Sequence, residues 1–214
     1  MKKKTKRCVI FGGAAIENYQ VLHTALRADD YMIFCDSGLK HAEALGIPPD
    51  LIIGDFDSHE NPHLPAETII LPHEKDDTDT AFAVKEALRR GFTDFLLCGV
   101  IGARMDHTLV NVSMLFLIEK AGAHALIRDD YEEMELISEG CGAYIPDSYP
   151  YFSLVALNGP AEGVSISGAL YNLDNARIDV LDPYATSNEV LPGETAHVTV
   201  QSGILLLIKV FDAV

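Results

Sequence analysis

Five aspartates between positions 51 and 79 have the type and spacing expected of a divalent-metal site. They fall in residues 54–58 (GDFDS) and 75–80 (KDDTDT), each after an apolar run: Asp55, Asp57, Asp76, Asp77 and Asp79. Carboxylates gathered in this way repel one another unless a cation or strong donors neutralise them. Hard oxygen ligands select Mg²⁺, Mn²⁺ or Ca²⁺, and Mg²⁺ typically takes one or two carboxylates together with substrate phosphates. The pattern predicts phosphate chemistry.

A third constellation, residues 102–111 (GARMDHTLVN), combines a flexible loop, a cation and a helix start. Arg104 can grip a phosphate with a forked geometry that lysine cannot copy. Asn111 follows His107 by one helical turn on the same face. An exposed arginine, a capping Asp106 and a structural histidine are the alternative interpretation.

Two short turns are weaker signals. Gly12 and Gly13 follow an apolar run and suit either a phosphate-binding turn or a tight strand-to-helix turn. Asp36-Ser37-Gly38 can bind a metal-bound water or a nucleotide hydroxyl, or can cap the next helix. The sequence contains neither G-x-x-x-x-G-K-[ST] nor G-x-G-x-x-G, which weakens a P-loop or dinucleotide interpretation.

Two familiar acidic motifs do not fit. Asp55-x-Asp57 begins like the D-x-D-x-[TV] motif of haloacid-dehalogenase phosphatases, but His59 stands at the fifth position. An EF-hand loop fails as well, because an apolar helical segment follows Asp79 with no loop glycine or distal glutamate at the required spacing.

Charge and composition exclude several classes. The 214 residues carry 16 basic and 32 acidic side chains, a net charge of −16, so nucleic acid and anionic membranes are not expected partners. Four separate cysteines without a C-x-x-C pair indicate reduced thiols in a cytoplasmic protein. Residues 2–7 are expected to form a solvated basic tail rather than a signal peptide.

The first part of the chain alternates apolar runs with helical patterns, which predicts a Rossmann-like parallel α/β domain. Glycines at positions 46, 91 and 122 are expected at helix C-termini. Expected strands are residues 8–11, 32–35, 51–53, 68–71, 95–98 and 124–127, and expected helices are 18–28, 39–45, 80–90 and 107–121. Ligands of such sheets collect beyond the carboxyl ends of the strands, so one rim could hold all the acidic motifs.

After residue 130 the pattern changes to short strands and turns. The clearest strands are residues 134–137, 151–157, 164–166, 196–200 and 204–210, separated by Gly, Pro, Asn and Asp. We expect a smaller antiparallel all-β sandwich or barrel. The predicted division is therefore 1–130 and 131–214.

Taken together, the ordered motifs GDFDS, KDDTDT and GARMDHTLVN resemble those of the thiamine pyrophosphokinase family, also called thiamine diphosphokinase. Residues 163–173 (GVSISGALYNL), 186–189 (TSNE) and 198–206 (VTVQSGILL) are similar to its C-terminal thiamine-binding domain. The resemblance covers nearly the whole chain from Cys8. Ala169 departs from it, because the family more often has leucine there.

The resemblance implies an N-terminal ATP- and Mg²⁺-binding catalytic domain and a C-terminal thiamine-binding domain. It implies a homodimer whose active sites lie between subunits. The reaction implied is ATP plus thiamine giving thiamine diphosphate and AMP, with Mg²⁺ required.

Residue roles follow from matching the motifs. Metal ligands are expected among Asp55, Asp57, Asp76, Asp77 and Asp79. Catalytic roles are expected for Asp57, Asp79, Arg104 and Asp106, with Asp106 as either a base or a metal ligand. ATP and phosphate binding is expected at Gly13, Asp36, Ser37, Gly38, Lys75, Thr78, Thr80, Arg104, His107 and Asn111. Ser187 and Asn188 are expected to bind the aminopyrimidine of thiamine.

Two rival functions remain at this point. A metal-dependent nucleotide phosphohydrolase would use water in place of thiamine and release phosphate or diphosphate without the vitamin. A non-catalytic thiamine- or nucleotide-binding module would bind thiamine without forming AMP.

Overall fold

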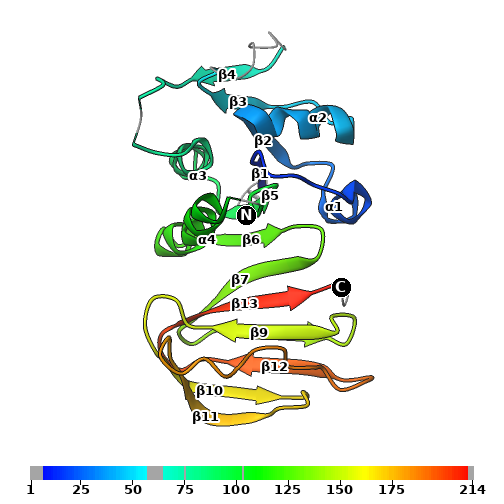
Figure 1. Cartoon of the computed structure of the whole chain (residues 1–214), viewed down its shortest axis with the longest axis vertical. Coiled ribbons are helices and arrows are strands. Elements are labelled where there is room, and N and C mark those ends of the chain that lie inside the picture. The colour runs from blue at the N-terminus through cyan, green and yellow to red at the C-terminus, as the bar shows by residue number, and fades with distance from the viewer. Residues whose placement is uncertain (1–6, 57–64, 75, 103, 212–214) are drawn as a thin grey trace, which may run out of the picture. The chain divides into compact units, whose positions relative to one another are not determined.

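A computed structural model describes residues 7–56, 65–74, 76–102 and 104–211 of the chain. The chain divides into two compact units, Met1–Asp130 and Tyr131–Val214. Helices and parallel strands fill the first unit, and antiparallel strands fill the second (Figure 1). The predicted fold class, parallel α/β followed by antiparallel β, is confirmed.

The described residues of the first unit, here the α/β unit, form six strands in the order β4-β3-β2-β1-β5-β6. Every neighbouring pair is parallel. The strands are β1 (Cys8–Phe11), β2 (Tyr31–Cys35), β3 (Leu51–Gly54), β4 (Glu67–Ile70), β5 (Asp94–Cys98) and β6 (His124–Arg128). All six expected strands are found, with ends shifted by at most one residue. The carboxyl ends of β1, β2, β3 and β5 therefore lie on one edge.

In the described parts of the connections, four α-helices and one short 3₁₀ helix lie between these strands. They are α1 (Tyr19–Ala25), η1 (Asp36–Leu39), α2 (Lys40–Leu45), α3 (Asp79–Arg89) and α4 (Met105–Lys120). Figure 1 shows α1 and α2 on one face of the sheet and α3 and α4 on the other. Gly46 ends α2 in the left-handed conformation, as its expected capping role requires.

Alternate residues of the strands serve these two faces. Val9 and Phe11 of β1 share a buried cluster with Leu22 of α1 and with Ala42 and Leu45 of α2. Helix α3 packs against β1, β2 and β3 on the opposite face. Since parallel strands covered on both sides are apolar along their whole length, the uninterrupted apolar runs of the sequence are accounted for.

Arg7 corrects one expectation. We expected it in a solvated basic tail, but its side chain is buried and binds both carboxylate oxygens of Asp30, at 3.0 and 2.7 Å. It also donates to the carbonyl of Ala25 at the end of α1. A buried arginine requires such a partner, and this one lies 23 positions away. Residues 2–6 of that tail lie outside the described residues.

The second unit, here the β unit, is a sandwich of antiparallel strands. Strands β7 (Glu132–Ser138), β13 (Ile204–Val210) and β9 (Tyr151–Val155) pair in that order. The other sheet has the order β11-β10-β12-β8. Its strands are β8 (Gly142–Pro146), β10 (Ala161–Ser167), β11 (Leu173–Ile178) and β12 (Thr195–Thr199). Side chains from both sets of strands, including Phe152, Val164 and Leu205, share one buried core.

Lys209 is the buried cation of this unit. Its Nζ lies 2.8 Å from Glu135 and 3.1 Å from Glu133, and Tyr149 donates to Glu133 at 2.9 Å. Burial opposes the charge of Lys209, but the two carboxylates prevail and raise its pKa. The three charges hold β13 against β7.

The cysteines and the helices each bear on an expectation from the sequence. Cys8, Cys35 and Cys98 are buried free thiols, and Cys141 is an exposed one. Within the described ranges, the helices are all too short or too polar to span a membrane.

Candidate active site

The glycine turn after β1, residues 12–15, is held closely to neighbouring backbone. The amide of Gly12 donates to Cys98 (2.9 Å) and that of Ala14 to Gly99 (2.8 Å). A Cβ on Gly13 would lie 2.0 Å from the Oγ of Ser37, so a larger residue here would require Ser37 to change rotamer. The structure therefore brings Gly13 and Ser37 together, and the ATP contacts assigned to them stay predictions.

Asp36 stands at the carboxyl end of β2 and begins η1. Its φ is +32°, an unfavourable value for a residue with a side chain. A Cβ on Gly54, at the end of β3, would lie 3.0 Å from the Cβ of Asp36. Asp55 follows Gly54 directly, and its carboxylate lies 4.0 Å from Nδ1 of His73. The backbones that carry Asp36 and Asp55 are thus neighbours.

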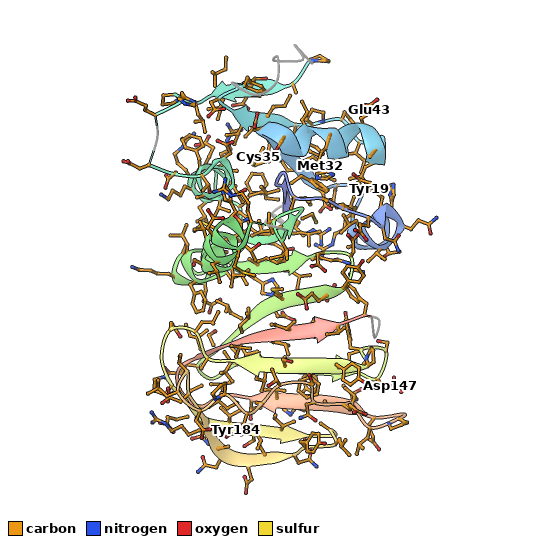
Figure 2. All side chains as sticks on the ribbon, in the orientation of Figure 1. Tyr19, Met32, Cys35, Glu43, Asp147 and Tyr184 are labelled. Atoms are coloured by element: carbon orange, nitrogen blue, oxygen red, sulfur yellow. The ribbon has the colours of Figure 1, made fainter. Side chains whose placement is uncertain are left out.

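The start of α3 also lies near Cys35, the residue before Asp36. Cys35 is labelled in Figure 2. Thr80 hydrogen-bonds to the Cys35 thiol. Burial raises the pKa of that thiol, and the negative charges of Asp79 and Asp36 raise it further. Asp36 and Asp79, 43 positions apart in the sequence, therefore act on the same thiol, as the predicted rim requires.

The neighbouring residues of the KDDTDT motif have other contacts. Thr78 is the N-cap of α3 and accepts the amide of Ala81 at 3.2 Å. Asp77 is held by Lys85 Nζ at 2.6 and 2.7 Å, whereas Asp76 is exposed. Of the two adjacent aspartates, Asp76 is therefore the one whose side chain faces solvent.

Asp57 and Lys75 fall outside the described residues, so their assigned roles stay predictions. Among the described residues, no group of three His, Cys, Asp or Glu side chains is arranged to hold a metal. A Mg²⁺ site built from one or two carboxylates and completed by phosphate oxygens does not need such a group.

Arg104 and Asp106 form an ion pair with each other. Arg104 donates through Nε (3.2 Å) and NH2 (2.5 Å) to the two oxygens of Asp106, and both side chains are largely exposed. The bond to Arg104 lowers the pKa of Asp106 to about 2. His107, the next residue, is exposed at the start of α4.

Asn111 is buried and donates to the carbonyl of Val100 at 2.7 Å. Thr108 both donates to and accepts from the backbone of Gly102. These contacts fix the loop before α4. Phosphate binding by Asn111 remains a prediction, and the structure adds a positioning role.

In the β unit, the side chain of Asn188 hydrogen-bonds to the backbone of Tyr171 and Glu189. Its Oδ1 accepts the amides of Tyr171 (3.0 Å) and Glu189 (2.9 Å), and its Nδ2 donates to the carbonyl of Tyr171 (2.8 Å). Ser187 is exposed and has a φ of +55°. Thiamine binding stays a prediction for both, and Ser187 has the more accessible side chain.

Sequence reasoning missed three residues near the glycine turn. Lys40 donates to the carbonyl of Gly13 at 2.8 Å. His41 is fully buried and contacts the carbonyl of Ala14 at 2.9 Å. Asp130 accepts the amides of residues 17 and 18, both at 2.8 Å. In the sequence, the one available signal for these residues was His41, a histidine on an otherwise apolar helix face.

Two family models match the chain in the order of its units. "Thiamin pyrophosphokinase, catalytic domain" matches residues 22–127, and "Thiamin pyrophosphokinase, vitamin B1 binding domain" matches residues 143–205. Thiamine pyrophosphokinase of Bacillus subtilis (strain 168) is 26% identical over 184 residues, 83% of this chain and 86% of that protein. Thiamine pyrophosphokinase 1 of Oryza sativa subsp. japonica is 24% identical over 186 residues, 75% of this chain and 66% of that protein, just under two thirds of its length.

Solved structures have the same fold. The crystal structure of thiamine pyrophosphokinase from Bacillus subtilis superposes with a TM-score of 0.86 at 24% identity, covering 97% of this chain and 100% of that one. The thiamin pyrophosphokinase family protein from Enterococcus faecalis gives 0.78 at 26% identity, covering 98% and 100%.

The fold and the matched domains define the class of protein as a two-domain diphosphotransferase. The chain belongs to the thiamine pyrophosphokinase family.

Proposed function

We propose that the chain transfers the diphosphate of ATP to the hydroxyl of thiamine, giving thiamine diphosphate and AMP in the presence of Mg²⁺. The observation that carries the proposal is the approach of Asp36, the Gly54–Asp55 strand end and Asp79 beside a glycine turn. The three acidic positions lie within the segment that matches the family's catalytic domain, and the glycine turn precedes it. A vitamin B1 binding domain follows in the same chain.

The two units take different substrates in this proposal. Residues 1–130 bind ATP and Mg²⁺, and residues 131–214 bind thiamine. The ranges of the matched models, 22–127 and 143–205, fall inside these limits. ATP contacts are assigned to the turns at Gly13 and Ser37, and thiamine contacts to the segment at Ser187.

The described residues fit Mg²⁺ by their chemistry. Asp55 and Asp79 offer carboxylate oxygens, the ligands that Mg²⁺ prefers, and Asp76 or Asp57 would add another. When bound, the metal would neutralise charge on the transferring diphosphate. Asp36 is assigned to the nucleotide.

In the reaction, the thiamine hydroxyl oxygen bonds to the β-phosphorus of ATP. The bond from that phosphorus to the oxygen bridging to the α-phosphorus breaks, AMP leaves with the electron pair, and the hydroxyl proton passes to solvent. Such transfers depend mainly on positioning and on stabilisation of charge. The chain's own contribution is to orient the phosphates at the glycine turn and the hydroxyl at Asp106.

The Arg104–Asp106 pair refines the role of Asp106. A carboxylate with a pKa of about 2 is a weak proton acceptor at neutral pH. While Arg104 holds it, Asp106 is suited to orienting the hydroxyl rather than removing its proton. Arg104 turning to a phosphate would release Asp106 and raise its basicity.

We further propose a cytoplasmic homodimer with active sites at the subunit interface. Large apolar side chains stand exposed on the β unit, among them Tyr171 (63% exposed) and Leu181 (92%). Exposed apolar groups of this kind mark interaction surfaces. Tyr171 is bonded to Asn188, so this surface adjoins the proposed thiamine segment.

The test is AMP release from ATP and Mg²⁺ with and without thiamine, with EDTA as a control and the product identified by mass. AMP formation that requires both thiamine and metal, with a gain of one diphosphate on the vitamin, supports the proposal. Nucleotide breakdown without thiamine indicates a phosphohydrolase, and binding of thiamine without AMP indicates a non-catalytic module.

A further inference from the structure

His41 is a buried polar residue that the proposed reaction does not use. It lies in the first turn of α2 with no exposed surface. Its Nε2 is 2.9 Å from the carbonyl oxygen of Ala14, and its Nδ1 is 2.8 Å from the hydroxyl of Tyr19. A carbonyl oxygen only accepts, so Nε2 must carry a proton. Burial lowers the pKa of His41, so the ring is neutral and the Tyr19 hydroxyl donates to Nδ1.

Tyr19, His41 and Ala14 therefore form one directed chain of hydrogen bonds. Tyr19 begins α1 and is labelled in Figure 2. Because the hydroxyl donates to one ring nitrogen, the other is fixed as the donor. The chain of bonds connects α1 and α2 to the glycine turn between β1 and α1.

His41 contacts a second carbonyl of the turn, that of Gly12. The same oxygen would lie 2.7 Å from a Cβ on Gly38, which shows that it points inward, towards η1. The carbonyls of Gly12 and Ala14 are thus both directed into the protein, with His41 between α2 and the turn.

The direction of these carbonyls fixes the direction of two amides. In a trans peptide the N–H of the following residue points opposite to the carbonyl, and the described residues have no cis peptide. The amides of Gly13 and Ala15 therefore point outward from the turn. Both residues are exposed, and in the described part of the chain neither amide takes part in a hydrogen bond. Outward amides on a glycine turn are suited to bind phosphate oxygens.

We propose that His41, fixed by Tyr19, is a positioning residue that holds the carbonyls of Gly12 and Ala14 inward and so presents the amides of Gly13 and Ala15 to the phosphates of the nucleotide. The inference rests on the proposed function, because the nucleotide is its substrate. Lys40, which holds the carbonyl of Gly13, supports the same turn from the neighbouring position.

The test compares Tyr19→Phe, His41→Gln and His41→Leu with His23→Leu as the matched control, since His23 is exposed on α1. Binding of α,β-methylene-ATP with Mg²⁺ is measured by calorimetry, and KM is measured for ATP and for thiamine. His41→Leu is expected to raise Kd and KM for the nucleotide about tenfold or more, with KM for thiamine unchanged. His41→Gln keeps a donor for Ala14 and is expected to recover most of this loss. Tyr19→Phe is expected to raise both values about threefold.

The outcomes separate the two levels of the proposal. If the wild-type chain binds no Mg²⁺-nucleotide, the proposed function fails. If it binds normally and folded His41→Leu binds equally well, the positioning role alone is overturned. Should His41→Leu fail to fold, Tyr19→Phe decides, because an unchanged nucleotide Kd in that folded variant contradicts the role. Equal increases in both KM values indicate a purely structural histidine.

Discussion

The two predicted substrate segments, one in each unit, use their polar side chains differently. In the α/β unit, a close backbone approach brings Asp36 and Asp55 to one edge of the sheet, and the charge of Asp79 acts on the Cys35 thiol beside Asp36. In the β unit, a buried side chain shapes the backbone, because Asn188 holds the amide and carbonyl of Tyr171. We therefore expect loss of an acidic side chain to affect the reaction in the first unit, and loss of a buried polar side chain to affect folding in the second.

The largest effect is expected from Lys209→Met, which removes the buried cation of the β unit. Two carboxylates would remain inside without it, at a cost of about 3–5 kcal/mol in the free energy of unfolding. The pKa of Lys209 is raised on folding, so its stabilisation is complete below the ordinary lysine pKa and is lost as pH rises through the folded value. Urea unfolding at pH 7 and above pH 10 measures both effects. Exposed Lys120→Met is the control, and a loss below about 1 kcal/mol would contradict the role.

Asp79→Asn tests the other side of the comparison. We expect AMP formation to fall by about 100-fold or more, about 2.7 kcal/mol, because a carboxylate beside the phosphates is lost. Thermal unfolding should be nearly unchanged, since Thr78 remains the cap of α3. Steady-state kinetics measures AMP formation and calorimetry measures thermal unfolding, with exposed Asp29→Asn as the control. Activity within tenfold of wild type would remove Asp79 from the site.

For Asn188→Ala, in contrast to Asp79→Asn, we expect a clear loss of stability. Its three hydrogen bonds to backbone are lost, which we expect to lower the free energy of unfolding by about 1–3 kcal/mol. KM for thiamine should rise more than KM for ATP, because the segment that carries Ser187 loses its support. Exposed Asn158→Ala is the control for denaturant unfolding. A higher thiamine KM at unchanged stability would instead indicate direct contact with the vitamin.

Ser187→Ala should have a smaller and purely functional effect. The side chain is exposed, so the free energy of unfolding should change by no more than about 0.5 kcal/mol. Loss of one hydrogen bond to thiamine is expected to raise its KM about fivefold, and KM for ATP should not change. Equal KM values for wild type and variant would exclude Ser187 from the thiamine site.

The smallest readout, a change in the titration of Asp106, is expected from Arg104→Gln at the surface of the α/β unit, and any loss of activity from the catalytic role predicted for Arg104 comes in addition. The bond to Arg104 holds the pKa of Asp106 at about 2, so the variant should raise that pKa towards the ordinary range of aspartate. Asp106 would then lose its charge on acidification at a higher pH than in the wild type. Carbon-13 NMR titration of the carboxyl group measures this. An unchanged titration would show that the pair does not persist in solution.

The elements best predicted from the sequence are those whose apolar pattern is complete. Strands β1, β2, β3 and β5 are almost wholly buried and their apolar runs are continuous, whereas β4 and β6 are partly exposed. The missed strands, β8 and β11, are the two edges of their sheet. Edge strands expose most of their side chains and tolerate residues such as Pro146 and Asn175, so they carry little apolar signal.

For the candidate site, acidic residues after strands could be found because strand ends and loops are local features. Contacts between residues that are distant in the sequence could not be predicted from it. Arg7 finds Asp30 across 23 positions, and His41 reaches a turn 27 positions earlier. The sequence indicates that Asn188 belongs to a motif, but only the structure shows that its amide is used by the backbone.

The close approach of Gly38 to the glycine turn has a consequence for how this edge opens. A Cβ on Gly38 would lie 2.5 Å from the carbonyl oxygen of Phe11, so the two backbones touch with no side chain between them. Because no side chain lies between them, η1 and the glycine turn are not expected to move apart independently. In native-state hydrogen exchange, the amides of Gly12 and Ala14 should therefore exchange through the same opening event as those of η1, as one cooperative unit.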